Sequence, residues 1–227
     1  KEGFTGPVTI LEGEFGFLNV YCRDADSSEL TRDLGTDFDT LNICLKRFSA
    51  HITAHTPIQA VLDLKAEVGF VGNDVEAMTV QGSEKMFTHH NILEPKDVML
   101  GQYSTPFCVA LAAHRDPLDP RSFSEENLNN VEIRALCRKV KVEQRNDLEG
   151  VTTPWASIVK ITLKDGRKLE KRADSFKGMP TDPVSRDDMQ SKFMRLTSDM
   201  GDEWQRRVWD GLADLENIQN MNELRLS

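Results

Sequence analysis

The sequence has 227 residues, of which 29% are charged and 39% hydrophobic, and its formal net charge is −9. These proportions are typical of a soluble globular protein with room for one large or two small domains. The acidic balance argues against nonspecific nucleic-acid binding, which needs a basic face. It leaves an anionic substrate open, because a local group of cations can oppose the net charge.

No apolar run approaches the ~20 residues of a membrane helix, and no secretory signal is visible, so we expect no membrane contact and a cytoplasmic location. The first residue is Lys1, in a glycine-rich stretch, which indicates a piece of a longer polypeptide. The cysteines are far apart, without the spacing of a zinc site, so we expect free thiols and no metal. They are Cys22, Cys44, Cys108 and Cys137.

The stretch over residues 41–57 carries the densest polar chemistry. Apolar residues alternate with polar ones over 41–46, which predicts a strand. Residues 57–68 then have helical spacing, with Thr56 as a cap, Pro57 in the first turn and a stop at Gly69. Between strand and helix lie two cations and two imidazoles, Lys46, Arg47, His51 and His55.

A lysine that leaves a strand and a histidine that approaches a helix N-terminus can face one cleft. Ammonium groups and helix-start amides both favour carboxylate or phosphate, so this turn is a candidate anion site. The alternative is a solvated turn without function, because turns of this kind are common and polar.

Residues 74–80 predict a strand, and residues 83–97 read as a polar loop with adjacent histidines, His89 and His90. No third ligand has suitable spacing, so exposed side chains are favoured over a metal site. Residues 97–113 are the most apolar segment and predict a buried helix, which Pro106 either kinks or begins.

The second half of the sequence alternates capped helices with strands. Helices are predicted after Ser124 and over 130–138. Strands are predicted at 140–142, 157–163 and 168–173, the last two joined by a hairpin, in an antiparallel sheet with one wet face. After a linker over 177–185, Ser185 caps a helix through Met200. A last helix carries an apolar stripe of Trp204, Val208, Trp209, Leu212 and Leu215.

Four stretches, taken in order, resemble the MmgE/PrpD family of 2-methylcitrate dehydratases and cis-aconitate decarboxylases. Residues 3–17, rich in glycine and phenylalanine, look like the end of its helical domain. Residues 45–51 are similar to its K-R-[FY]-P-A-H turn, and 101–103 to its S-x-Q-Y helix. Residues 176–193 resemble its G-x-P linker and the helix that follows.

The resemblance implies an α+β lid domain flanked by segments of an all-helical domain. Residues 1–40 would finish the helical domain, 41–176 would form the lid, and 177–227 would return to the helical domain. The sequence would then be a C-terminal half whose N-terminal helical half is a partner chain or a missing segment. A homodimer or heteromer is expected.

By position, the resemblance makes Lys46, His51 and Tyr103 the catalytic residues. We expect Lys46 and His51 to bind substrate as well, together with His55, which lies one turn beyond His51. A residue-level reading leaves other roles open: His55 as a cap and Tyr103 as a core aromatic. Two positions depart from the family. Ser49 stands where proline is usual, and Leu100-Gly101 where a serine is usual. The family's remaining site residues belong to the N-terminal half.

Members of the family act without a cofactor on small di- and tricarboxylates, by losing water, losing CO2 or epimerising. We therefore expect a lyase in which Lys46 holds a substrate carboxylate, Tyr103 or His51 moves a proton, and lid closure excludes water. The alternatives are an epimerase of an amino-dicarboxylate, a noncatalytic subunit, and an interaction module that docks a partner on its last helix.

Overall fold

A computed structural model describes residues 3, 5–148, 150 and 155–220. Its chain divides into two compact units, Lys1–Ile43 and Cys44–Ser227. Each unit is described by itself below. The predictions for the two ends of the chain fall partly on Phe4 and on residues 221–227, which lie outside the described residues.

The first unit contains little regular structure. Its elements are the helix α1 (Phe17–Tyr21) and two 3-10 turns, Ser27–Leu30 and Asp39–Asn42. The side chain of Asp26 caps the first of these turns by accepting from the amide of Ser28. Large apolar side chains remain exposed in this unit, Val8, Phe15, Tyr21, Leu34 and Leu41.

The strand predicted over residues 41–46 is wrong. Leu41 lies in the second 3-10 turn, and no strand is assigned from there to Lys46. The amide of Leu45 donates to the carbonyl of Gly178, 2.7 Å away, and no neighbouring strand pairs with it. Alternating apolar residues need a partner strand to satisfy their backbone groups, and the described residues supply none here.

The second unit is built on a four-stranded sheet in the order β2-β1-β3-β4. The strands are β1 (Val75–Gly82), β2 (Val140–Gln144), β3 (Ser157–Leu163) and β4 (Lys168–Ala173). The α+β class is thus confirmed. The sheet is mixed and not purely antiparallel, because β1 and β2 run parallel. A long helical crossover joins these two strands and brings the chain back to the same end of the sheet.

One face of the sheet is wet, as the alternation predicts. Lys141, Thr79, Lys160 and Glu170 follow one another across the four strands in register. All but Thr79 are exposed, and Lys160 pairs with Glu170. The next row, which includes Val80, is buried against helices.

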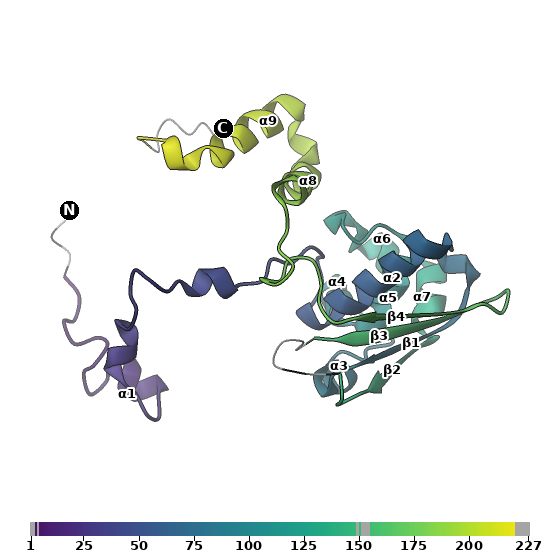
Figure 1. Cartoon of the computed structure of the whole chain (residues 1–227), viewed down its shortest axis with the longest axis horizontal. Coiled ribbons are helices and arrows are strands. Elements are labelled where there is room, and N and C mark those ends of the chain that lie inside the picture. The colour runs from purple at the N-terminus through teal and green to yellow at the C-terminus, as the bar shows by residue number, and fades with distance from the viewer. Residues whose placement is uncertain (1–2, 4, 149, 151–154, 221–227) are drawn as a thin grey trace. The chain divides into compact units, whose positions relative to one another are not determined.

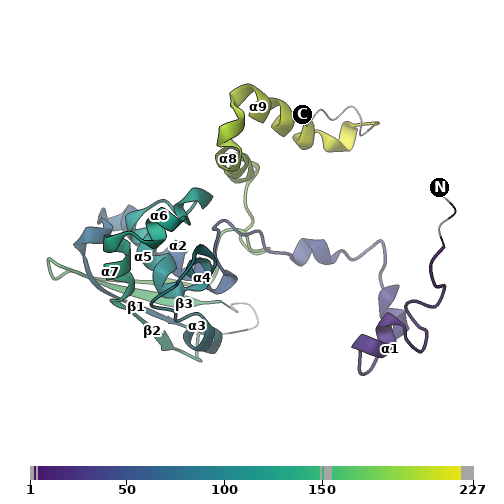
Figure 2. The same cartoon turned by 180° about the vertical axis from the view of Figure 1, so that it is seen from behind.

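The opposite face of the sheet is covered by helices (Figures 1 and 2). The main ones are α2 (His55–Val68), α5 (Thr105–His114) and α7 (Val131–Cys137), with the shorter α3 (Glu84–His89) and α6 (Glu125–Leu128) nearby. Helix α5 is apolar all round and almost completely buried. Burying each large core side chain contributes about 1.5–3 kcal/mol to folding stability. This layer of helices on the sheet therefore stabilises the second unit.

Two helix predictions needed correction. Helix α2 begins at His55, and the hydroxyl of Thr56 donates to the carbonyl of Trp155 instead of capping. The polar loop predicted over 83–97 contains α3, because the hydroxyl of Ser83 caps it by accepting from the amide of Met86. The stop at Gly69 is confirmed, in the left-handed region at φ +75°.

The apolar segment over 97–113 forms two helices, α4 (Val98–Tyr103) and α5. Ser104 separates them, since its hydroxyl accepts from the amide of Phe107 and caps α5. Pro106 lies in the first turn of α5, as one of the two readings predicted. The break leaves Tyr103 at the end of α4, with its side chain 46% exposed.

The chain closes with α8 (Arg186–Leu196) and α9 (Asp202–Ala213). Ser185 caps α8 as predicted, but α8 ends at Leu196 and a 3-10 turn covers Ser198–Met200. On α9, Val208 is buried, while Leu212 remains 42% exposed. The predicted apolar stripe is therefore only partly covered in the part of the chain that is described.

Candidate functional site

Residues of the 46–51 turn and the end of α4 line one cavity of about 310 Å³. We call it the His51 cavity. The turn is joined to α4 by a backbone hydrogen bond in which the amide of His51 donates to the carbonyl of Gln102, 2.8 Å away. The lining residues are Lys46, Phe48, Ser49, Ala50, His51, Gln102 and Tyr103.

The three residues expected to be catalytic therefore lie together. Lys46, His51 and Tyr103 all line this cavity, although Tyr103 is 52 positions beyond His51 in the sequence. The rings of His51 and Tyr103 are 5.1 Å apart between centroids. An ammonium, an imidazole and a phenol thus face one space, which is a combination that can bind an anion and move a proton.

The partners of His51 define its neutral form. Its Nδ1 accepts from the amide of Thr53, at 3.4 Å, and lies 3.0 Å from the hydroxyl of the same residue. The proton of the neutral ring is consequently on Nε2. Burial, and then the charges of His90, Lys85 and Lys46, lower the pKa of His51 to about 4.

His90 is a further member of the site that the sequence did not reveal. Its ring stacks on that of His51, with centroids 4.0 Å apart, and its Nδ1 donates to the backbone carbonyl of Tyr103 at 3.0 Å. The residue is only 3% exposed. It was expected in a solvated loop, and only the folded arrangement brings it to Tyr103.

His55 does not line the His51 cavity. It is completely buried between Phe48 and Phe176, whose ring centroids lie 5.2 and 4.7 Å away. Neither ring nitrogen makes a hydrogen bond of good geometry within the described residues. Burial, with the charge of Lys46, lowers its pKa to about 3. Lys46 and His51 therefore line the cavity, whereas His55 is buried and does not reach it.

The two departures from the family pattern have different surroundings. Ser49 lines the His51 cavity. Gly101 is buried, and a Cβ there would meet the ring of Phe107 at 3.3 Å and Leu128 at 3.4 Å. The S-x-Q-Y pattern places its serine at Leu100, which is half-buried on α4, so this chain carries no hydroxyl at that position.

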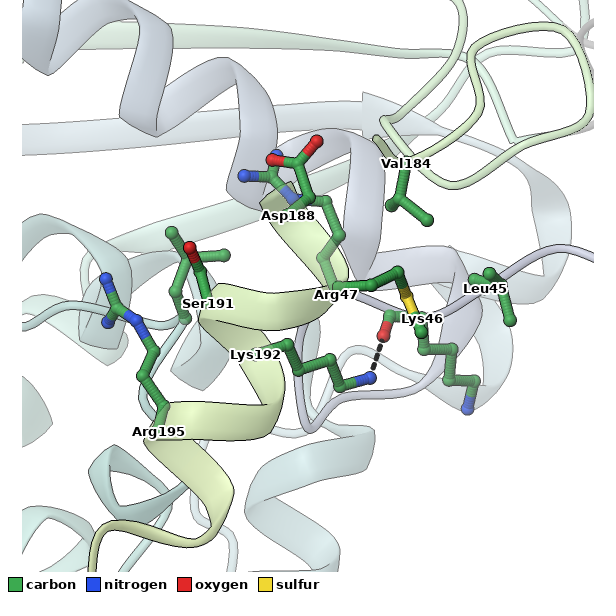
Figure 3. A pocket seen from close by; sticks show the side chains of 10 residues that line it. Leu45, Lys46, Arg47, Val184, Asp188, Ser191, Lys192 and Arg195 are labelled. Carbon is green, nitrogen blue, oxygen red and sulfur yellow. Dashed lines mark hydrogen bonds between the residues drawn. The ribbon is translucent and has the colours of Figure 1, made fainter. Parts of the chain in front are cut away.

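A second cavity, of about 210 Å³, lies between the 45–47 turn and α8 (Figure 3). We call it the α8 cavity. Lys192 extends from α8 to the turn, and its amine donates to the backbone carbonyl of Lys46. Lys46 is the residue common to both cavities.

Residues 48–215 match the MmgE/PrpD C-terminal domain. The chain belongs to the MmgE/PrpD family. Two cis-aconitate decarboxylases are similar to it. The protein of Homo sapiens is 24% identical over 232 aligned positions, 98% of this chain and 46% of the human one. The protein of Mus musculus is 23% identical over 168 positions, 71% of this chain and 34% of the mouse one.

This MmgE/PrpD chain thus spans less than half the length of the curated relatives it matches. Among its described residues, no helix is long and apolar enough to cross a membrane. The same part of the chain contains no group of three acidic, histidine or cysteine side chains placed to hold a metal ion.

Proposed function

We propose that this chain forms one wall of the active site of a cofactor-independent lyase that acts on a small di- or tricarboxylate. The observation that supports the proposal most is the convergence of Lys46, His51 and Tyr103 on one cavity. The family assignment and the likeness to cis-aconitate decarboxylases point to the same class of reaction.

In this proposal Lys46 pairs with a substrate carboxylate. Loss of CO2 or of water leaves negative charge beside a remaining carboxylate, and a fixed ammonium in a cavity closed to water stabilises that charge. Decarboxylation breaks a C–C bond, the electron pair stays on the substrate carbon, and a proton then takes the place of CO2.

The proton is assigned to Tyr103, with His51 as its neutral neighbour. Because the pKa of His51 is lowered to about 4, its ring is neutral near pH 7 and donates only a hydrogen bond from Nε2. Such a donor can hold a developing oxyanion. Tyr103 carries the ionisable hydroxyl on the same cavity.

The cavity is open, so we propose that an N-terminal helical domain of the family, as a separate chain or part of a longer one, completes it. Exposed apolar residues on α9, such as Leu212, provide a surface for that partner. The same exposure supports a second candidate, in which the chain is a noncatalytic subunit that only docks a partner.

The test is to assay the chain, together with a polypeptide that carries the family's N-terminal domain, on cis-aconitate, 2-methylcitrate and iminodisuccinate. Product NMR then separates loss of CO2, loss of water and epimerisation. Lys46→Met and Tyr103→Phe should each lower turnover by about 10²–10⁴-fold. Lys96→Met, on an exposed lysine away from both cavities, is the control.

Unchanged turnover in Lys46→Met would remove that residue from the mechanism. A correctly assembled complex that is inactive on all three substrates would favour the noncatalytic subunit.

A further inference from the structure

The α8 cavity gathers cations that the proposed reaction does not use. Arg47, Lys192 and Arg195 line it together with Lys46, although the whole chain carries a net charge of −9. Figure 3 shows that these side chains come from the 45–47 turn and from α8. Like charges held close together destabilise a fold unless something neutralises them.

Most of this positive charge is not paired with a carboxylate among the residues that the structure describes. Among the described residues, neither Lys46, Arg47 nor Lys192 makes an ion pair, although other lysines and arginines do. The Arg47 guanidinium donates to Gln59, and the Lys192 amine to a backbone carbonyl, and both acceptors are uncharged. Arg195 alone of the four is paired, with Asp116.

The one carboxylate on the cavity, Asp188, is already engaged elsewhere. Lys177 lies 2.6 Å from its Oδ2, and the amide and hydroxyl of Ser185 donate to the same oxygen. The Lys177 ammonium, and then Ser185, lower the pKa of this carboxyl. Its charge is therefore shared with Lys177, and it forms no ion pair with Lys46, Arg47 or Lys192 among the described residues.

The remaining wall is mostly apolar. Leu45, Leu118, Val184 and Met189, with the polar Ser191, complete the lining. A buried water needs about 10–15 Å³ of cavity volume measured in this way, so about 210 Å³ has room for a small organic group. A cavity with apolar walls and a few convergent charges is the usual form of a small-molecule site.

We propose that the α8 cavity binds a small anion, with a phosphate or carboxylate head held by Arg47 and Lys192 and an apolar body against Leu118 and Met189. The site is separate from the His51 cavity, because the two share only Lys46. A guanidinium supplies paired donors for an oxyanion, and an ammonium adds a point charge.

The probes are phenyl phosphate and phenylacetate, titrated into the whole chain at low salt and followed by calorimetry and by amide chemical shifts. Inorganic phosphate tests the head alone, and phenol tests the apolar body alone. We expect saturable binding of at least one aryl anion, tighter than that of inorganic phosphate, with shifts at 45–47 and in α8. The better of the two aryl anions identifies the head group.

Arg47→Gln and Lys192→Gln should each weaken binding of that aryl anion by about tenfold or more, since each removes one charge-assisted contact. Arg47→Lys, which keeps the positive charge, should retain part of the affinity that Arg47→Gln loses. Lys96→Gln should bind as the unaltered chain does, because Lys96 is exposed and lines neither cavity. His51→Ala and Tyr103→Phe should also bind normally, which separates this site from the proposed active site.

The proposal is overturned if neither aryl anion binds saturably, or if Lys192→Gln and Arg47→Gln bind as well as the unaltered chain does. It is also overturned if phenol binds as tightly as phenyl phosphate. Thermal unfolding of each variant by circular dichroism checks that a loss of binding is not a loss of fold.

Discussion

The His51 cavity and the α8 cavity share Lys46 but are built from opposite kinds of polar group. Aromatic and imidazole rings line the first, and burial lowers the pKa of His51 there to about 4. Guanidinium and ammonium groups of arginine and lysine side chains line the second. Proton transfer therefore suits the first cavity, while the second is suited only to holding negative charge.

The largest expected effect comes from a change that disturbs both cavities at once. Gly178 has φ +117°, and a Cβ on it would collide with the carbonyl of Leu45. Gly178→Ala should lower the free energy of unfolding by more than the 1–3 kcal/mol typical of backbone strain alone. Denaturant unfolding measures it.

Gly166→Ala is the matched control, because Gly166 has φ +89° and open space around its Cβ position. Gly166→Ala should lose the stability that backbone strain costs, without the further loss from a steric collision. Equal losses in the two variants would mean that the contact with Leu45 adds nothing.

The next effect should be confined to the His51 cavity. His90→Ala removes the ring that stacks on His51 and the donor to the Tyr103 carbonyl. We expect a loss of about 2 kcal/mol in stability, as for other buried truncations. We also expect the pKa of His51 to rise from about 4 towards 6.5, because water gains access and one repelling imidazole is lost.

A titration of the His51 ring protons by NMR measures this pKa. His90→Phe keeps a stacked ring but cannot donate to the Tyr103 carbonyl. It therefore separates the contribution of the ring stack from that of the hydrogen bond. An unchanged His51 pKa in His90→Ala would show that the stack has no electrostatic role.

Between pH 7 and pH 5, stability should depend on pH through the buried imidazoles. The pKa of His55 is about 3 in the folded chain and about 6.5 when unfolded, so below pH 6.5 the unfolded chain takes up a proton that the folded chain does not. The contribution of His55 to the free energy of unfolding should therefore fall as the pH falls from 6.5 to 4, by at most about 1.4 kcal/mol per pH unit, and His51 adds a contribution of the same sign.

Chemical unfolding at pH 7 and pH 5 gives this slope. His55→Leu, which keeps an apolar group between Phe48 and Phe176, should flatten it. Lys192→Gln should diminish the slope only slightly, because its charge lowers the pKa of His55 less than burial and the charge of Lys46 do. A slope that persists undiminished in His55→Leu would assign the effect to other groups.

The smallest expected effect concerns the paired cation of the α8 cavity. The Arg195 and Asp116 side chains are 39% and 51% exposed, and exposed pairs contribute about 0–1 kcal/mol. Arg195→Gln should thus change the unfolding free energy by less than about 1 kcal/mol in a thermal or denaturant melt. A larger loss would show that the pair also orders α8.

Local signals in the sequence predicted most of the elements. Helix α2 ends at Gly69 because its left-handed φ stops a helix, and Ser185 begins α8 through its capping hydroxyl. The strand over 41–46 was wrong because a strand depends on a neighbour that sequence alternation does not show. His51 and Tyr103 are far apart in the sequence, and the family resemblance, not their spacing, predicted that they belong to one site.

The rest of the site required the folded chain. His90 contacts Tyr103 through a backbone carbonyl. Every residue has such a carbonyl, so the residue types at these positions do not indicate the contact. The burial of His55 follows from Phe176, 121 positions later in the sequence. The α8 cavity arises where the 45–47 turn meets a helix that begins at Arg186. None of these three contacts is local, so no sequence window contains them.

The close approach of Leu45 and Gly178 has a mechanical consequence. The amide of Leu45 donates to the carbonyl of Gly178, so the segments that enter and leave the sheet-and-helix body are joined at one crossing. The two ends of this body therefore lie side by side, which is the topology of an inserted module whose ends can be spliced together.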